Sequence, residues 1–204
     1  MKKYLWVMAA LLSQLPAYAK SEMPRLQDGD LIFHQSTSAQ SLAIQRATGS
    51  PYSHMGIVLW RDGKPYVFEA VATVRYTPLE RWIGRGAGRR FVVKRLRDAD
   101  KQLTPAALAR LRHEASRLRG KPYDLTFEWS DRRIYCSELV WKMYQRALGL
   151  EIGRLQRIRD FSLEDPAVRR KLRERYGRQV PLDEPVVSPR AMLESALLET
   201  VVAR

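Results

Sequence analysis

Cys136 is the only cysteine in the chain, and it lies where a polar loop gives way to an apolar segment of helical periodicity. Val140, Met143 and Ala147 follow it at helical spacing, which predicts a helix with one buried face, ended by Gly149. The free N–H groups and the dipole at a helix N-terminus favour a thiolate over a thiol. Cys136 is therefore a candidate nucleophile, although a free cysteine is often only a buried apolar side chain.

A cysteine nucleophile needs an imidazole base, and the imidazole needs a third group that fixes its tautomer. The chain offers three histidines. His113 lies within a predicted helix between two charged residues, where we expect it to face solvent. His34 ends a predicted strand, where a core or turn role explains it equally well. His54 opens the most apolar predicted strand, where its side chain can reach a cleft, so it is the candidate base.

A predicted β-hairpin relates His54 to an acid. Its strands cover residues 54–60 and 66–71, and Asp62-Gly63 supplies the positive φ angles of a two-residue turn. The pairing set by this turn makes His54 and Glu69 diagonal neighbours on one face of the sheet. The hairpin therefore predicts that the two side chains lie within reach of each other.

Glu69 is the preferred orienting acid because it lies between two apolar residues in an apolar strand, whereas Asp62 and Glu80 lie outside the predicted strands. Gly56 is expected opposite Glu69, where the missing side chain would leave open space between the histidine and the acid. A bulge at Pro65 would shift the register and separate them.

The first residues predict export. Two lysines, an apolar run over 4–12 and the small-x-small sequence Ala17-Tyr18-Ala19 are typical of a secretory signal peptide over residues 1–19, cleaved after Ala19. The apolar run is too short to span a membrane, and no later stretch approaches the ~20 apolar residues required. No cysteine follows the predicted cleavage site, which argues against a lipid anchor. We therefore expect a soluble periplasmic product with one domain over residues 20–204.

A lone cysteine is unusual in an exported protein, because cysteines there are commonly paired as disulfides. The formal net charge is +14, from 36 Lys and Arg against 22 Asp and Glu, and favours anionic partners. Export makes nucleic acid the least suitable partner and favours anionic envelope surfaces, either cell-wall polymer or acidic lipid headgroups. Interspersed charge, as in residues 169–173, is explained equally well by a solvated helix face.

The remaining pattern predicts an α+β fold in which helices frame an antiparallel sheet. Capping residues and turn residues mark the boundaries of these elements. We predict strands at 31–34, 73–76 and 91–95, a Gly-rich basic loop at 84–90, and helices at 38–48, 104–120, 165–177 and from 188.

Five short motifs, in this order, resemble the YiiX/YebB-like family of NlpC-type papain-like cysteine hydrolases. They are Gly-Asp-Leu-Ile-Phe at 29–33, Ser-His-Met-Gly at 53–56, Phe-Glu-Ala at 68–70, Gly-Lys-Pro-Tyr-Asp at 120–124 and Tyr-Cys-Ser-Glu at 135–138. The resemblance covers nearly all of the mature chain. It implies a circularly permuted papain-like fold, with an antiparallel sheet or small barrel packed against helices. Papain-type enzymes place cysteine before histidine, and the reversed order here is the one that the permutation requires.

The resemblance implies a catalytic triad of Cys136, His54 and Glu69, the same three residues that the sequence pattern indicates. It also implies hydrolysis of amide or ester bonds in cell-wall peptides or acylated molecules, without a cofactor. Ser53, Tyr123 and Tyr135 are candidate substrate-binding residues. A packed tyrosine in a turn explains Tyr123 as well. No zinc-ligand spacing is present, because three separated histidines and one cysteine do not form one.

Two other functions remain open at this point. An acyltransferase would share the thioester step and differ only in the acceptor of the acyl group. A non-catalytic binder of anionic polymer or lipid that retains a papain-like shell would depend on charge and on aromatic residues such as Trp82, Trp129 and Trp141, and would not need Cys136.

The basic segments 84–90 and 169–175 predict a salt effect that separates binding from chemistry. Added salt should raise the apparent KM for anionic polymer or vesicles, since exposed charges are screened beyond about 8 Å at physiological ionic strength. Turnover of a small neutral ester should change little. A salt series with both substrate types measures this, and Cys136→Ser should retain the salt-sensitive binding. Loss of binding in that variant with its fold intact would contradict recruitment by charge.

Overall fold

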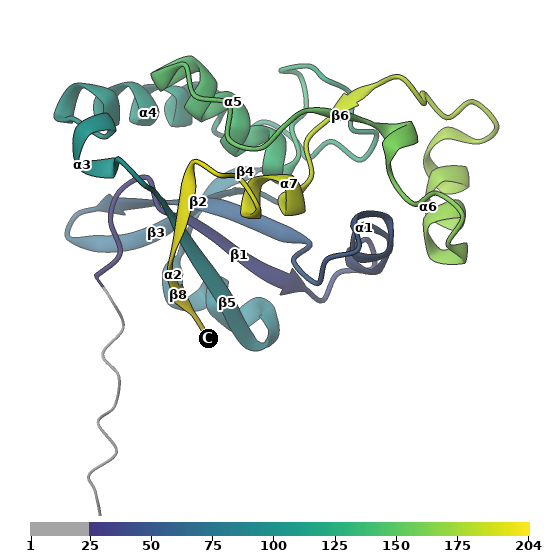
Figure 1. Cartoon of the computed structure of the whole chain (residues 1–204), viewed down its shortest axis with the longest axis horizontal. Coiled ribbons are helices and arrows are strands. Elements are labelled where there is room, and N and C mark those ends of the chain that lie inside the picture. The colour runs from purple at the N-terminus through teal and green to yellow at the C-terminus, as the bar shows by residue number, and fades with distance from the viewer. Residues whose placement is uncertain (1–24) are drawn as a thin grey trace, which may run out of the picture.

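The computed structural model describes residues 25–204, and the predicted signal peptide lies outside them. A six-stranded antiparallel sheet with the order β4-β3-β2-β1-β5-β8 forms the centre of the fold (Figure 1). A short ribbon pairs β6 (Gln156–Arg157) with β7 (Pro185–Val186). The strands of the sheet are β1 (Leu31–Ser36), β2 (His54–Arg61), β3 (Lys64–Ala70), β4 (Val74–Pro78), β5 (Gly86–Leu96) and β8 (Leu198–Ala203).

Helices cover both faces of the sheet and one end of it. Helices α4 and α5 pack on one face, α2 packs on the other, and α1 and α6 lie together beyond the end of β1 (Figure 1). No helix in the described part of the chain combines the length and apolarity that crossing a bilayer requires. The helices are α1 (Ser41–Thr48), α2 (Leu79–Arg85), α3 (Ala99–Gln102), α4 (Pro105–Leu118), α5 (Cys136–Leu148), α6 (Pro166–Tyr176), α7 (Pro189–Leu193) and the 3₁₀ turn η1 (Ile158–Asp160).

The hairpin of β2 and β3 has the predicted register. Asp62 and Gly63 adopt φ angles of 49° and 71°, as a turn of two left-handed residues requires. Arg61 pairs with Lys64, and the register continues without a bulge through Pro65. The turn residues therefore set which side chains of the two strands share a face.

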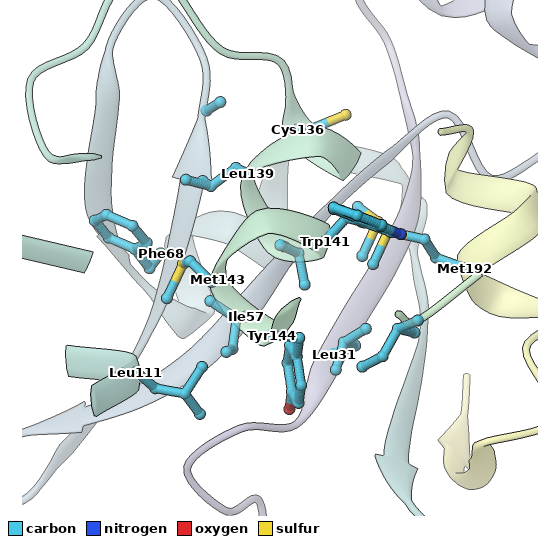
Figure 2. Close-up of a cluster of buried hydrophobic side chains, with 14 of the residues drawn as sticks. Leu31, Ile57, Phe68, Leu111, Cys136, Leu139, Trp141, Met143, Tyr144 and Met192 are labelled. Atoms are coloured by element: carbon cyan, nitrogen blue, oxygen red, sulfur yellow. The ribbon is translucent and has the colours of Figure 1, made fainter. Parts of the chain in front are cut away.

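Helix α5 also matches its prediction. It begins at Cys136 and ends at Gly149, which adopts φ 72°, and the predicted apolar face is buried along its whole length. Figure 2 shows Leu139 and Met143 packed in the core with Phe68, while Cys136 lies at one end of the cluster. The helix is thus held by the core, and its first residue is placed at the edge of that core.

The predicted loop at 84–90 is wrong. Residues up to Arg85 belong to α2, and β5 starts at Gly86, where it pairs with Ser36 of β1. Glycine and arginine give this stretch no strand pattern, and the pairing comes from the neighbouring strand instead. The sequence pattern also missed β8, a short edge strand that pairs with β5.

Gly56 does not leave open space beside Glu69, which corrects the expectation from the sequence. A Cβ atom at Gly56 would lie 2.4 Å from Val67 Cγ1, 2.8 Å from the Phe68 oxygen and 3.3 Å from the Glu69 Cβ. The position is closely packed, so glycine is needed there for the approach of β2 and β3.

Gly56→Ala should therefore destabilise the fold by about 1–3 kcal/mol, the usual cost of overpacking a core. Urea unfolding measures the change. Gly84→Ala is the matched control, because the nearest atom to its added Cβ lies at an ordinary 3.6 Å and the residue is helical. Equal stability of Gly56→Ala and the wild type would show that the two strands can separate at no cost.

Candidate active site

Cys136 and His54 meet where α5 and β2 both begin. The imidazole of His54 and the thiol of Cys136 form a hydrogen bond, and the backbone N–H groups of Met55 and Ser137 also point at the sulfur. Cys136 is only 2% exposed. The predicted nucleophile and the predicted base are thus brought into direct contact.

The contact depends on His54 being the first residue of its strand. Side chains of a strand alternate between two faces. Met55 and Ile57 belong to the core that contains α5, whereas Val58 belongs to the core that contains α2. His54 therefore lies on the α2 face, opposite to α5, and only a ring at the strand end can reach Cys136.

Glu69 holds the other side of the imidazole. Its Oε2 lies 2.7 Å from Nε2 of His54, which leaves the second ring nitrogen for the thiol. Three further groups donate to the fully buried carboxylate: Thr77 Oγ1 at 2.6 Å, Trp82 Nε1 at 2.9 Å and Arg85 at 2.5 and 2.7 Å. The acid predicted from the hairpin is therefore fixed in position from three separate elements.

The sequence pattern did not predict these three partners of Glu69. Thr77 lies on β4, and Trp82 and Arg85 lie on α2 at positions three apart, which share a helix face. That spacing is the one feature of the sequence that links Trp82 to Arg85, but it does not indicate that this helix face contacts Glu69. Arg85 also belongs to the basic segment 84–90, so part of that charge serves the buried carboxylate.

His34 is a packed side chain of the site. It is buried, pairs with His54 across the strands, and stacks on Trp82 with the ring centroids 3.9 Å apart. Burial, together with the charges of His54 and Arg85, lowers the pKa of His34 to about 3. A neutral ring at this position supports His54 without competing for its proton. His113 is exposed, as expected.

The electrostatics of the site favour charged partners. Burial opposes the charged imidazole, but hydrogen bonds and charge from Cys136 and Glu69 outweigh it and raise the pKa of His54 to about 9. Burial likewise opposes the Glu69 anion, but its hydrogen bonds to His54, Thr77 and Arg85 lower the pKa of Glu69 to about 2. The carboxylate is thus ionised at neutral pH and stabilises an imidazolium beside it.

The same balance activates the thiol. Burial is the largest influence on Cys136 and disfavours the thiolate. The hydrogen bond and charge of His54 and the N–H groups of Met55 and Ser137 outweigh it, so that the pKa of Cys136 is lowered. These groups hold the proton on the imidazole and the negative charge on sulfur.

The three predicted substrate-binding residues have different surroundings. Tyr123 is half-buried, accepts a hydrogen bond from Gln40 at 3.2 Å and contacts the Cys136 thiol, so it borders the reacting sulfur. The hydroxyl of Ser53 is buried, 2.6 Å from the Ser41 hydroxyl.

Tyr135 is buried, and its hydroxyl accepts the N–H of Val187 at 3.0 Å. Ser53 also accepts an N–H, from Ser36. The hydroxyls of Ser53 and Tyr135 are therefore hydrogen-bonded within the fold, and Tyr123 is the one of the three whose hydroxyl contacts the thiol.

The aromatic residues expected of a polymer binder are not surface residues. Trp82 is fully buried beside Glu69, and Trp141 is 7% exposed. Trp129 packs edge-on against Trp141 and carries the Lys142 ammonium over its ring at 4.9 Å. The structure thus uses these three rings for packing, so a binder of anionic polymer would have to rely on other aromatic residues.

The chain belongs to the family of permuted papain-like amidase enzymes that includes YaeF and YiiX, the C92 family, whose model matches residues 25–202. The match confirms the resemblance inferred from the five motifs and the permuted papain-like fold. Of the two sheet forms expected, the structure has the open antiparallel sheet, with β4 and β8 at its edges.

Within this family the chain is similar to YiiX. It is 47% identical to the uncharacterized protein YiiX of Escherichia coli (strain K12) over 201 residues, which cover 98% of this chain and 96% of that protein. The crystal structure of metalloprotein yiiX from Escherichia coli O157:H7 superposes with a TM-score of 0.83 at 49% identity. The superposition covers 87% of this chain and 97% of the yiiX chain.

The raised pKa of His54 and the lowered pKa of Cys136 predict a bell-shaped pH profile for reaction of the thiol. Iodoacetamide should alkylate Cys136 well below pH 8, where an ordinary thiol of pKa about 8.5 is mostly protonated. Acylation by an ester should fall on the acid side as the thiolate is protonated. On the alkaline side it should fall near pH 9 as His54 loses its proton.

The urea-unfolded protein is the control for this profile, because its cysteine should titrate as a free thiol. An alkylation midpoint for the folded protein that equals or exceeds the unfolded value would contradict the thiolate–imidazolium pair.

Proposed function

We propose that this protein is an exported cysteine hydrolase that cleaves an amide or ester bond through Cys136, His54 and Glu69. The observation that carries the proposal is the continuous hydrogen-bonded chain from the thiol through the imidazole to the buried carboxylate. Membership of a family of amidases supports the same reaction class. The predicted signal peptide at 1–19 is the basis for proposing a periplasmic location.

The reaction is a transfer of an acyl group to water by way of a thioester. The Cys136 thiolate attacks the carbonyl carbon, and a bond from sulfur to carbon forms while the carbonyl electrons move to oxygen. As the tetrahedral intermediate collapses, the bond to the leaving group breaks and the His54 imidazolium gives that group its proton. The neutral imidazole then takes a proton from water, whose oxygen attacks the thioester carbonyl. The bond from sulfur to carbon breaks, the acid is released, and the thiolate is regenerated beside the imidazolium.

Two groups are placed to stabilise the negative oxygen of the tetrahedral intermediate. The N–H of Cys136 is the first of helix α5 and has no acceptor within the helix. The hydroxyl of Tyr123 accepts from Gln40 and adjoins the Cys136 sulfur, so we propose that its own proton is donated to the substrate oxygen once a carbonyl is bound there. One such donor contributes about 3–4 kcal/mol in comparable sites.

The proposed reaction is derived without a metal. One solved relative is called a metalloprotein. Among residues 25–204 of this chain, no group of three or more His, Cys, Asp or Glu side chains could hold an ion. Each step above uses side chains and backbone of this chain alone.

The proposed partners outside the active site are anionic envelope surfaces. Helix α6 carries Arg169, Arg170 and Arg173 as exposed side chains. Arg169 has one acidic neighbour, Glu164, at 3.9 Å. This excess of positive charge on one helix supports electrostatic association with acidic polymer or headgroups.

Acylation of Cys136 tests the proposed function directly. Intact-mass measurement with a small acylating ester should show one added acyl group on the wild type and none on Cys136→Ser. Glu69→Gln should lower the acylation rate by roughly 10²- to 10⁴-fold, since a neutral amide neither stabilises the imidazolium nor sets its tautomer.

Glu80→Gln is the matched control, because Glu80 was the alternative acid and its side chain is 75% exposed. It should react like the wild type. Equal rates for Glu69→Gln and Glu80→Gln would remove Glu69 from the mechanism. An acyl group that leaves to an added amine or alcohol in preference to water would make the protein an acyltransferase.

A further inference from the structure

Cys136 lines an apolar pocket between α1 and α6. The pocket has a volume of about 110 Å³. Ala43 and Ala47 of α1 form one wall, and Val168 and Leu172 of α6 form the other. The lining is almost entirely apolar. A pocket of this kind beside a nucleophile is suited to an apolar part of a substrate.

The two cationic side chains in the lining are compatible with an apolar pocket. Lys171 and Arg175 line the pocket from α6. The Lys171 ammonium lies 2.6 Å from Glu174, and the Arg175 guanidinium lies over the Phe127 ring at 5.1 Å. Their charged ends thus have partners of their own, and their aliphatic stems cover the wall.

A second groove, on the His54 side of the site, has the opposite character. Ser36, Ser38 and Arg85 line it together with the glycine-rich start of β5. It is wider than the apolar pocket and more polar. The proton that the leaving group needs comes from the ring of His54, which is part of this lining.

The pocket and the groove are parts of one site. Gln40, Ile44 and Tyr123 line both of them. Cys136 lines the apolar pocket and His54 lines the polar groove, and the two side chains contact each other. A substrate carbonyl at the sulfur would therefore have an apolar space on one side and a polar space on the other.

We infer that the apolar pocket between α1 and α6 binds the acyl chain of the substrate, and that the polar groove beside His54 binds the leaving group. The substrate class is then an amide or ester of an unbranched apolar acid with a polar amine or alcohol. This inference rests on the proposed function. A cavity of 150 Å³ accepts benzene, so the volume of about 110 Å³ fits roughly four or five carbons of a chain beyond the carbonyl.

A series of 4-nitrophenyl esters from acetate to decanoate tests the inference. Each methylene that enters the pocket should raise kcat/KM about fourfold, up to roughly six carbons, and longer chains should give no further rise. N-acetyl-leucine 4-nitrophenyl ester is the competing substrate, since it offers the branched side chain of a peptide. A higher kcat/KM for it than for hexanoate would overturn the choice of an unbranched acyl chain.

Two variants of the pocket lining test whether the dependence on chain length arises in the pocket. Ala47→Leu should reduce the ratio of hexanoate to acetate turnover by at least about tenfold, because it fills the space of roughly two or three methylenes. Leu172→Ala should move the preferred chain to greater length. Leu42→Ala is the matched control, because Leu42 lies on α1, is 45% exposed and is not part of the lining. It should leave the chain-length profile unchanged.

The outcomes separate the inference from the function on which it rests. If Cys136 is acylated and the rate is independent of chain length, the pocket does not bind the chain and the hydrolase proposal stands. If no ester acylates Cys136, the proposed function itself fails. If Ala47→Leu is poorly folded by circular dichroism, the profile of Leu172→Ala decides alone, and an unchanged profile there overturns the inference.

Discussion

The geometry of the candidate active site depends on the hydrogen bonds of the buried Glu69 carboxylate. This carboxylate has no exposed surface and receives hydrogen bonds from His54, Thr77, Trp82 and Arg85. A buried anion is costly unless its lone pairs are satisfied. Here four donors satisfy it, so that the acid stays ionised and the imidazole beside it is favoured in its charged form. The positive charge on His54 in turn favours the thiolate form of Cys136.

The hydrogen bonds of these four donors also link separate elements of the fold. Glu69 lies on β3, while its partners come from β2, β4 and α2. The same carboxylate therefore fixes the base and holds α2 against the sheet. A side chain supported in this way by rigid elements is held in a defined geometry. Loss of one donor would act on packing and on the charge of His54 together.

The position of His54 at the start of its strand explains how two faces of the sheet share one active site. Helix α5 brings Cys136 from one face, and α2 holds Glu69 on the other. The histidine at the strand end is the residue that reaches both. This arrangement also places the apolar pocket at Cys136 next to the polar groove at His54.

The sequence by itself determined the local parts of this site. The start of α5 at Cys136 follows from apolar spacing and Gly149, and the pairing of His54 with Glu69 follows from the Asp62-Gly63 turn, because a turn fixes the register of the strands it joins. Only the tertiary structure decided that Trp82 and Arg85 satisfy Glu69, that Gly56 is tightly packed, and that α1 and α6 enclose a pocket at Cys136. Those contacts join segments distant in the chain, and their geometry comes from the packing of whole elements, which no local pattern of residues records.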